Sequence, residues 1–214
     1  MVAVALMADA AREAVLARVQ AALGPAAAPA AEIPRAYRQA GRELHPDAVV
    51  DRFCERVGEY RARVQRVPAG ALEDLVAGML AGRRVLVPAA PPCALHGIAV
   101  LRDDAPLSAR ELDRADAVLT GCALAVAETG TIVLDGTAAC GRRALTLVPD
   151  HHVCVVRAEQ IVVDVPDMIA ALRRTGAMRR PITLVSGPSA TSDIELERVE
   201  GVHGPRLLDV VVVT

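Results

Sequence analysis

The chain has 214 residues, enough for one substantial domain with an appendage; 53% of them are hydrophobic, 23% charged and only 1% aromatic. A formal net charge of −2 gives no field to attract a polyanion, and so few aromatic side chains leave little base stacking, so we expect no nucleic-acid partner. Pro, Arg and His interrupt the apolar stretches well before the roughly 20 residues that a membrane span needs. The N-terminus lacks the basic start of a secretory signal. We therefore expect a cytoplasmic protein with no membrane span.

The first 45 residues are expected to form a helical arm and a linker. Apolar residues recur at helical spacing over 9–23, and the stretch "GPAAAPAAEIP" that follows contains three prolines and a glycine. Residues 46–214 are expected to form the main domain. Helical periodicity resumes over 45–67, where a His-Pro-Asp sequence gives a start signal, and a further helix is expected over 71–80.

The remainder of the chain consists of short β-branched runs separated by turns or short helices. The runs are apolar at nearly every position instead of alternating, which indicates strands buried on both faces, as in a parallel or mixed sheet covered by helices. The predicted fold class is therefore α/β. The predicted strands lie within residues 83–88, 97–102, 116–120, 131–135, 144–149, 153–157, 160–165, 181–186 and 207–213. Helix signals occur between them as capping boxes at 108–111 and 192–195 and as a Pro-initiated segment over 166–176.

The basic residues and the cysteines exclude several chemistries. Every basic residue other than His is Arg, and both a Walker A loop and Schiff-base chemistry, including pyridoxal phosphate attachment, require Lys. The five cysteines are scattered and include no Cys-x-x-Cys pair. We therefore expect reduced thiols, mainly in the core, and no metal or cofactor bound by the chain. These residues are Cys54, Cys93, Cys122, Cys140 and Cys154.

A candidate acidic residue lies in the stretch "AVAETGTIVLDG". Glu128 falls between a small apolar run and a predicted strand, and Thr129, Gly130 and Thr131 follow it. A glycine at this point lets the backbone turn and expose its amides to an anion. An acid beside a glycine is also common in turns that have no function. The segment predicts either a structural turn or a carboxylate that serves as a nucleophile, a base or a ligand acceptor.

Two adjacent histidines follow in "VPDHHVCVV", where we expect a polar loop between two strands. Adjacent residues of an extended segment point to opposite faces, so His151 and His152 cannot easily bind one metal ion together. They are expected to be hydrogen-bonded loop residues or, alternatively, to include one functional imidazole. His203 is a third candidate of equal standing.

The stretch "SGPSATSDIE", residues 186–195, follows the predicted strand at 181–186. Its second half fits a helix N-cap, with a Ser and a Glu in the capping-box positions. Capping does not account for the first half, which allows either an anion-binding loop or plain turn chemistry. The residues in question are Ser186, Gly187, Ser189 and Thr191.

Together, "AVAETGTIVLDG", "LTLVPDHHVCVVRAEQIV" and "SGPSATSDIELERVEGVHGPRLLDVVVV" resemble the LUD domain of the LutC-type lactate-utilisation proteins, from about Leu86 to the C-terminus. The resemblance implies a three-layer αβα fold similar to the NagB/RpiA/CoA-transferase group. It also implies a cytoplasmic system that oxidises L-lactate to pyruvate with partner proteins that carry iron-sulfur clusters. Cluster-bearing relatives have further cysteine motifs that are missing here, so the chain looks like the cluster-free subunit. Within this resemblance, the 127–130 loop looks like the Ser-Glu-Asn-Gly loop of CoA-transferases.

The leading hypothesis is a cluster-free subunit of a lactate-oxidising complex with a cleft for a carboxylate or another small anion. Such clefts lie where strand carboxyl ends meet helix starts. Glu128 and His203 are the candidate catalytic residues, and Arg142 or Arg143 could supply a cation. One alternative is a stand-alone CoA-transferase-like enzyme in which Glu128 accepts the acyl group. The other is a non-catalytic scaffold that docks partners through its N-terminal arm. The expected anion-binding residues are Thr129, Gly130, Thr131, Ser186, Gly187, Ser189 and Thr191.

Overall fold

The computed structural model describes residues 2–24, 33–188 and 204–214, and the chain divides into two units, 1–38 and 39–214. In the first unit, helix α1 (Val2–Leu23) starts earlier than the predicted segment 9–23. Several large apolar side chains of α1 are exposed, namely Val15, Leu16, Val19 and Leu23. Within the described residues, no helix is both long and apolar enough to cross a membrane.

The second unit begins with helix α2 (Pro46–Glu59), whose Pro lies in the first turn as the sequence indicates. The prediction that the helix continues to residue 67 is wrong. Arg61 has a left-handed φ of 63°, and after it the chain forms strand β1 (Arg63–Val67). All five residues of β1 pair with the last strand, β10 (Leu207–Val213), so sheet pairing overrides the local helical pattern.

The main sheet has six strands in the order β1-β10-β7-β4-β2-β3, and every neighbouring pair is parallel. Its remaining members are β7 (His151–Arg157), β4 (Ala117–Thr120), β2 (Arg84–Val87) and β3 (Ala99–Arg102). Strands β2, β4, β7 and β10 are almost wholly buried, as their continuous apolar runs predict.

A second sheet of four strands has the order β8-β5-β6-β9. Strand β6 is antiparallel to both of its neighbours, and β5 is parallel to β8. The sequence prediction missed β5, because an Ala-rich segment has weak β propensity. The four strands are β5 (Leu124–Val126), β6 (Thr131–Leu134), β8 (Ile161–Val162) and β9 (Thr183–Val185).

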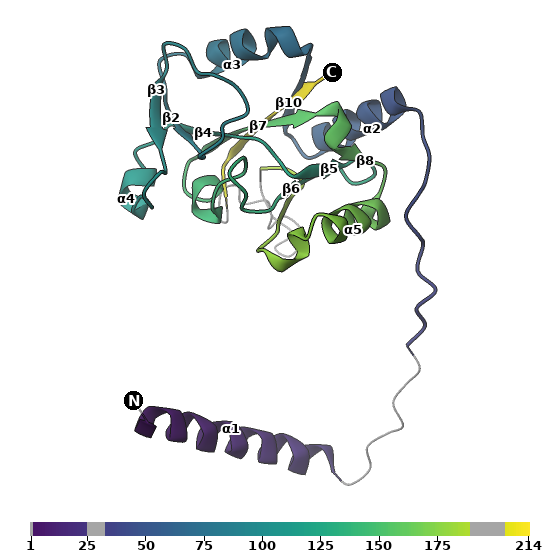
Figure 1. Ribbon diagram of the computed structural model, residues 1–214, viewed down its shortest axis with the longest axis vertical. Helices are drawn as coiled ribbons and strands as arrows, with labels where there is room; N and C mark the ends of the chain where they lie inside the picture. The colour runs from purple at the N-terminus through teal and green to yellow at the C-terminus, as the bar shows by residue number, and fades with distance from the viewer. Residues whose placement is uncertain (1, 25–32, 189–203) are drawn as a thin grey trace. The chain divides into compact units, whose positions relative to one another are not determined.

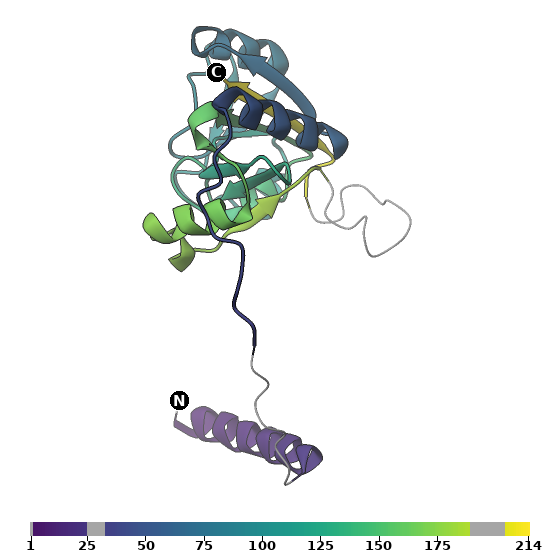
Figure 2. The same cartoon turned by 90° about the vertical axis from the view of Figure 1, so that its right-hand side faces the viewer.

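Helices cover the sheets in layers. Helix α3 (Leu72–Leu80) packs on one face of the main sheet, and α2 packs between the other face and the second sheet. Helix α5 (Val165–Arg174) covers the outer face of the second sheet. Both views show α3 and α5 at opposite sides of this unit (Figure 1, Figure 2). The prediction of an α/β fold with a parallel sheet flanked by helices is confirmed.

Two predictions concern the short connections between strands: the capping box at 108–111 is confirmed, and the strand over 144–149 is wrong. Helix α4 (Ala109–Leu112) begins with the predicted capping box, in which the Ser108 amide donates to Glu111 Oε2 at 2.8 Å. The box at 192–195 lies outside the described residues. The strand predicted over 144–149 is instead a 3₁₀ helix, Arg143–Thr146. A short apolar run fits either state, and here the backbone bonds are local, with the Leu145 amide donating to the Arg142 carbonyl at 3.0 Å.

Candidate functional site

The turn between β5 and β6 carries the predicted carboxylate and is held against helix α2. Gly130 has a left-handed φ of +60°, and a Cβ placed on it would lie 2.7 Å from the Val57 nitrogen and 2.8 Å from the Arg56 carbonyl carbon. Because both atoms belong to the helix backbone, neither can move aside cheaply. The backbone of α2 therefore lies directly against the turn, and only glycine fits this position.

Three hydroxyl groups form a hydrogen-bonded chain beside this turn. Thr129 Oγ1 lies 2.8 Å from Thr131 Oγ1, which lies 2.7 Å from Ser186 Oγ. Ser186 follows β9, and the antiparallel pairing of β6 with β9 brings it opposite Thr131. Each hydroxyl has one proton, and the two contacts use two of the three. One proton of the three is therefore left to donate a hydrogen bond outside the chain.

Glu128 begins the turn and is fixed through its backbone. Its amide donates to the Val163 carbonyl at 3.0 Å, and its side chain is 29% exposed. Glu128 Oε1 lies 3.9 Å from an Arg42 terminal nitrogen, and the Arg42 side chain is 49% exposed. An ion pair this long and this exposed contributes little energy. We name Glu128, Thr129, Thr131 and Ser186 the hydroxyl site.

Helix α2 adds a cation that sequence reasoning missed. The Arg56 Cβ would lie 2.9 Å from a Cβ on Gly130, and Tyr60, one turn later, packs in the same way against Gly187, which has φ +134°. An Arg56 terminal nitrogen donates to both oxygens of Glu59, at 2.9 and 2.8 Å. Arg56 Nε is buried and has no hydrogen-bond partner among the described residues. No local pattern in the sequence places Arg56 beside a turn that lies about seventy residues later.

The two arginines predicted to serve the site are engaged elsewhere. Arg142 forms a bidentate pair with Asp103, at 2.7 and 2.9 Å, and also donates to the Leu107 carbonyl. This hydrogen bonding holds the pKa of Asp103 below its usual value. An Arg143 terminal nitrogen donates to the Thr146 carbonyl at 3.0 Å. Arg142 therefore ties its connection to the segment between β3 and α4, and Arg143 bonds within its own turn.

His151 and His152 lie within strand β7 and are only 2% and 1% exposed, so the expectation of a polar loop is wrong. They do point to opposite faces. On the α3 side, His151 Nδ1 lies 2.5 Å from an Arg83 nitrogen, and His151 Nε2 lies 2.6 Å from Asp209 Oδ2. Because Arg can only donate, Nδ1 accepts and Nε2 carries the proton. On the other side, His152 Nε2 lies 2.8 Å from Thr120 Oγ1.

Asp209 completes a buried polar network in the centre of the main sheet. Arg63 donates to both of its oxygens, at 2.5 and 2.6 Å. Burial on its own would raise the pKa of Asp209, but the hydrogen bonds from His151 and Arg63 outweigh burial and lower it. The network satisfies these buried groups and explains His151 without a catalytic role. His203, Ser189 and Thr191 lie outside the described residues.

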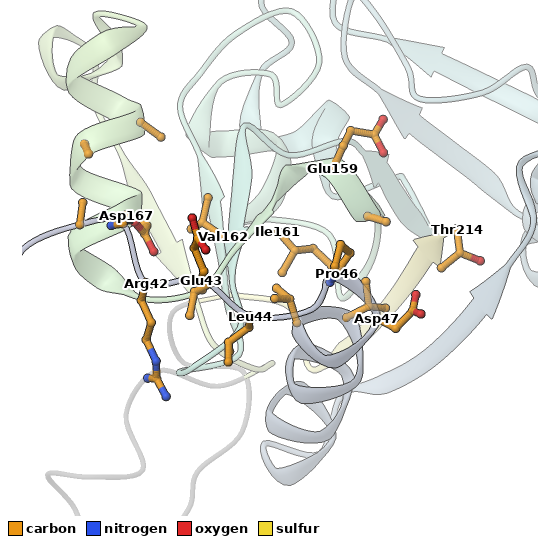
Figure 3. A pocket seen from close by; sticks show the side chains of 18 of the residues that line it. Arg42, Glu43, Leu44, Pro46, Asp47, Glu159, Ile161, Val162, Asp167 and Thr214 are labelled. Atoms are coloured by element: carbon orange, nitrogen blue, oxygen red, sulfur yellow. Dashed lines mark hydrogen bonds between the residues drawn. The ribbon is translucent and has the colours of Figure 1, made fainter.

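A large cavity adjoins the hydroxyl site along strand β8. It has a volume of about 1370 Å³, above the roughly 300–1,000 Å³ of small-molecule pockets. Ile161 and Val162 form part of its floor between α5 and the start of α2 (Figure 3). Arg42 lines it and also faces Glu128, and the Gly41 amide fixes this entering segment by donating to Asp167 at 2.7 Å. Within the described part of the chain, no three His, Cys, Asp or Glu side chains could hold a metal ion.

The fold and the hydroxyl site define an α/β domain in which a small second sheet presents a carboxylate and three hydroxyls beside a helix. The LUD domain family model matches residues 102–213, more than half of the chain, and the chain belongs to this family. It is 54% identical over 168 residues to lactate utilization protein C of Deinococcus radiodurans, covering 77% of this chain and 79% of that protein.

Two further comparisons agree with this membership. Lactate utilization protein C of Geobacillus kaustophilus is 32% identical over 166 residues, which cover 68% of each chain. The crystal structure of a DUF162 family protein from Deinococcus radiodurans superposes with a TM-score of 0.70 at 45% identity, covering 80% of this chain and all of that chain.

Proposed function

We propose that the chain acts in lactate utilisation as the cluster-free subunit of a system that oxidises L-lactate to pyruvate, and that its partners carry the iron-sulfur clusters. The names of its relatives in Deinococcus and Geobacillus support the lactate role. We further propose that the hydroxyl site binds a small carboxylate. The observation that carries this second part is the continuous chain of Thr129, Thr131 and Ser186 hydroxyls.

The chemistry of the hydroxyl site suits a 2-hydroxy or 2-oxo acid. The outward hydroxyl proton donates to a carboxylate oxygen. Arg56, whose Cβ lies against the Gly130 position, carries a buried Nε without a partner among the described residues and offers a second, positively charged donor. Glu128, next to the turn, accepts the proton of a substrate hydroxyl. The C2–H bond breaks at the same carbon, its two electrons pass to the partner proteins and its hydrogen leaves as a second proton. In this proposal the chain binds and orients the acid and needs no cofactor of its own.

The test uses the intact system in the source organism. A tagged chain purified from lactate-grown cells should bring down iron-rich proteins together with lactate-oxidising activity. A deletion strain should fail to grow on lactate, and the wild-type gene should restore growth. Normal growth of the deletion strain on lactate would contradict the role in lactate utilisation.

Variants of the same strain test the site. Thr131→Val removes the central hydroxyl and keeps the side-chain shape, so it should fail to restore growth. The matched control is Thr175→Val, since within the described residues the Thr175 hydroxyl bonds only to the carbonyls of Ala171 and Leu172 in its own helix. If Thr131→Val restores normal growth but deletion of residues 1–34 does not, the chain is a scaffold and the proposed site is wrong.

A further inference from the structure

The last turn of helix α2, residues 56–60, lies against both loops of the hydroxyl site. One loop contains Gly130 and Thr131, and the other contains Ser186 and Gly187. A Cβ placed on Gly130 would lie 2.7 Å from the α2 backbone, and a Cβ on Gly187 would lie 2.8 Å from a side chain of the same turn. The hydroxyls that join the two loops, Thr131 Oγ1 and Ser186 Oγ, lie 2.7 Å apart. This turn of α2 therefore runs beside the point where the two loops meet.

Arg56 and Glu59 form an ion pair on this turn that engages only part of the guanidinium group. Arg56 Nη1 donates to both Glu59 oxygens, at 2.9 and 2.8 Å. Arg56 Nε is buried and has no hydrogen-bond partner among the residues that the structure describes. A buried donor without an acceptor costs free energy, which a ligand oxygen placed beside it would recover. The Nε side of the guanidinium is therefore the part that an added acceptor would satisfy.

Other arginines of this chain bind carboxylates through a different edge of the guanidinium. Arg63 donates to Asp209 through Nε and Nη2, at 2.5 and 2.6 Å. Arg142 donates to Asp103 through the same two nitrogens, at 2.7 and 2.9 Å. Two parallel N–H groups on one edge match the two oxygens of a carboxylate. In Arg56 the partner from the same helix is bound through Nη1 alone, so the matching edge remains for a second carboxylate.

Helix stability gives no reason for an acid at position 59. Glu59 is the last residue of α2, where the negative end of the helix dipole disfavours a carboxylate. An Arg that precedes its Glu along a helix is also the less favourable order for such a pair. The two side chains are 35% and 49% exposed, and an ion pair this exposed is weak. The position of Glu59 is better explained by what it does to Arg56.

We propose that Glu59 is a positioning residue of the hydroxyl site, which holds Arg56 so that its Nε edge takes both oxygens of the ligand carboxylate. This inference rests on the proposed binding of a small carboxylate. Glu59 acts through Arg56 and does not touch the ligand. A long side chain that is ordered before the ligand arrives removes an entropy cost that binding would otherwise incur. The ligand class is a free carboxylate, because an ester or an amide lacks two equivalent anionic oxygens.

Calorimetric titration of the full chain with pyruvate tests the role of Glu59. Glu59→Ala removes the tether on Arg56 and should weaken binding by about 2- to 12-fold, the cost of ordering one long side chain on binding. The matched control is Glu55→Ala. Glu55 lies one residue before Arg56 and acts on it through charge alone, so the control removes the same charge from the same helix and keeps the tether. Glu55→Ala should bind pyruvate at least as tightly as the wild type, because it removes an acid near a site for an anion.

The sign of the change separates positioning from charge. If Glu59 acted through its charge alone, Glu59→Ala would bind pyruvate more tightly, as we expect for Glu55→Ala. Glu59→Gln keeps an oxygen that can accept from Arg56 Nη1 and should therefore restore most of the affinity lost in Glu59→Ala. Urea unfolding should be close to that of the wild type for both Glu59 variants, since the pair is exposed.

Arg56→Lys tests the edge itself. Lys keeps the positive charge but has no planar pair of N–H groups, so pyruvate binding should weaken at least about tenfold. Wild-type affinity in this variant would overturn the proposed use of the Nε edge. If the wild type binds pyruvate and Glu59→Ala binds it equally or more tightly, the role of Glu59 is wrong while the carboxylate site stands. If the wild type does not bind pyruvate, the carboxylate site and this inference are both wrong.

Discussion

Replacing Gly130 with Ala tests whether helix α2 lies directly against the turn of the hydroxyl site. A non-glycine residue in the left-handed region costs about 1–2 kcal/mol. The new methyl group would also lie 2.7–2.9 Å from the backbone of α2 and the Arg56 Cβ, and such overpacking typically adds about 1–3 kcal/mol. We therefore expect Gly130→Ala to lower the free energy of unfolding by about 2–5 kcal/mol. Gly82→Ala is the matched control, because Gly82 has φ +72° and open space around its Cβ position.

Urea unfolding at pH 7, followed by circular dichroism, measures both variants. Gly82→Ala should lower the free energy of unfolding only by the cost of the left-handed backbone conformation, about 1–2 kcal/mol. The difference in free energy of unfolding between the two variants then measures the contact with α2. The slope of the free energy against urea should stay constant if the native and unfolded states keep their compactness. Equal destabilisation by the two substitutions would refute the close packing of α2 on the turn, and with it the place of Arg56 beside the hydroxyl site.

Three further changes probe other parts of the structure. Asp209→Asn leaves buried polar groups without their charged partner and should cost about 3–5 kcal/mol in urea unfolding at pH 7. Folding lowers the pKa of Asp209. The ionised carboxylate therefore stabilises the folded state at pH values above its pKa in the unfolded chain, about 4, and this stabilisation should disappear as the pH falls through the lower pKa of the folded state. Thr131→Val should weaken pyruvate binding at least about tenfold by calorimetry, equal to about 1.4 kcal/mol. Arg142→Gln should cost about 1–2 kcal/mol of stability and leave pyruvate binding unchanged.

Most strands of the main sheet could be predicted because both faces of them are buried. Such strands require apolar residues at nearly every position, and a run such as 207–213 shows this directly. The sequence could not predict β1, because its residues continue a helical period and only pairing with a strand 146 residues later makes it extended. Strand β5 was missed for a different reason, because the Ala-rich segment around it carries almost no strand signal of its own.

The candidate site was predictable in part. The turn at Glu128 and the segment at Ser186 stand out by composition, and the structure joins them through Thr131. Arg56 did not stand out, because a helix surface normally carries arginines and only the packing of α2 on Gly130 brings this one to the turn. The paired histidines misled for the opposite reason. A polar residue inside a buried strand is indistinguishable from a loop residue until its partners, such as Asp209, are known.

The position of the last strand has a consequence for synthesis of the protein. Strand β10 lies inside the main sheet, between β1 and β7, yet it follows both of them in the sequence and is made after them. Arg63 must wait for Asp209, 146 residues later, which at translation rates of about 5–20 residues per second is about 7–30 s. Until then the edge of β1 that faces the gap has no partner, and once β7 has been made its facing edge has none either, so the nascent chain exposes first one and then two strand edges to other chains. Synthesis of residues 207–213 closes the gap, and a chain that stops short of them retains both open edges.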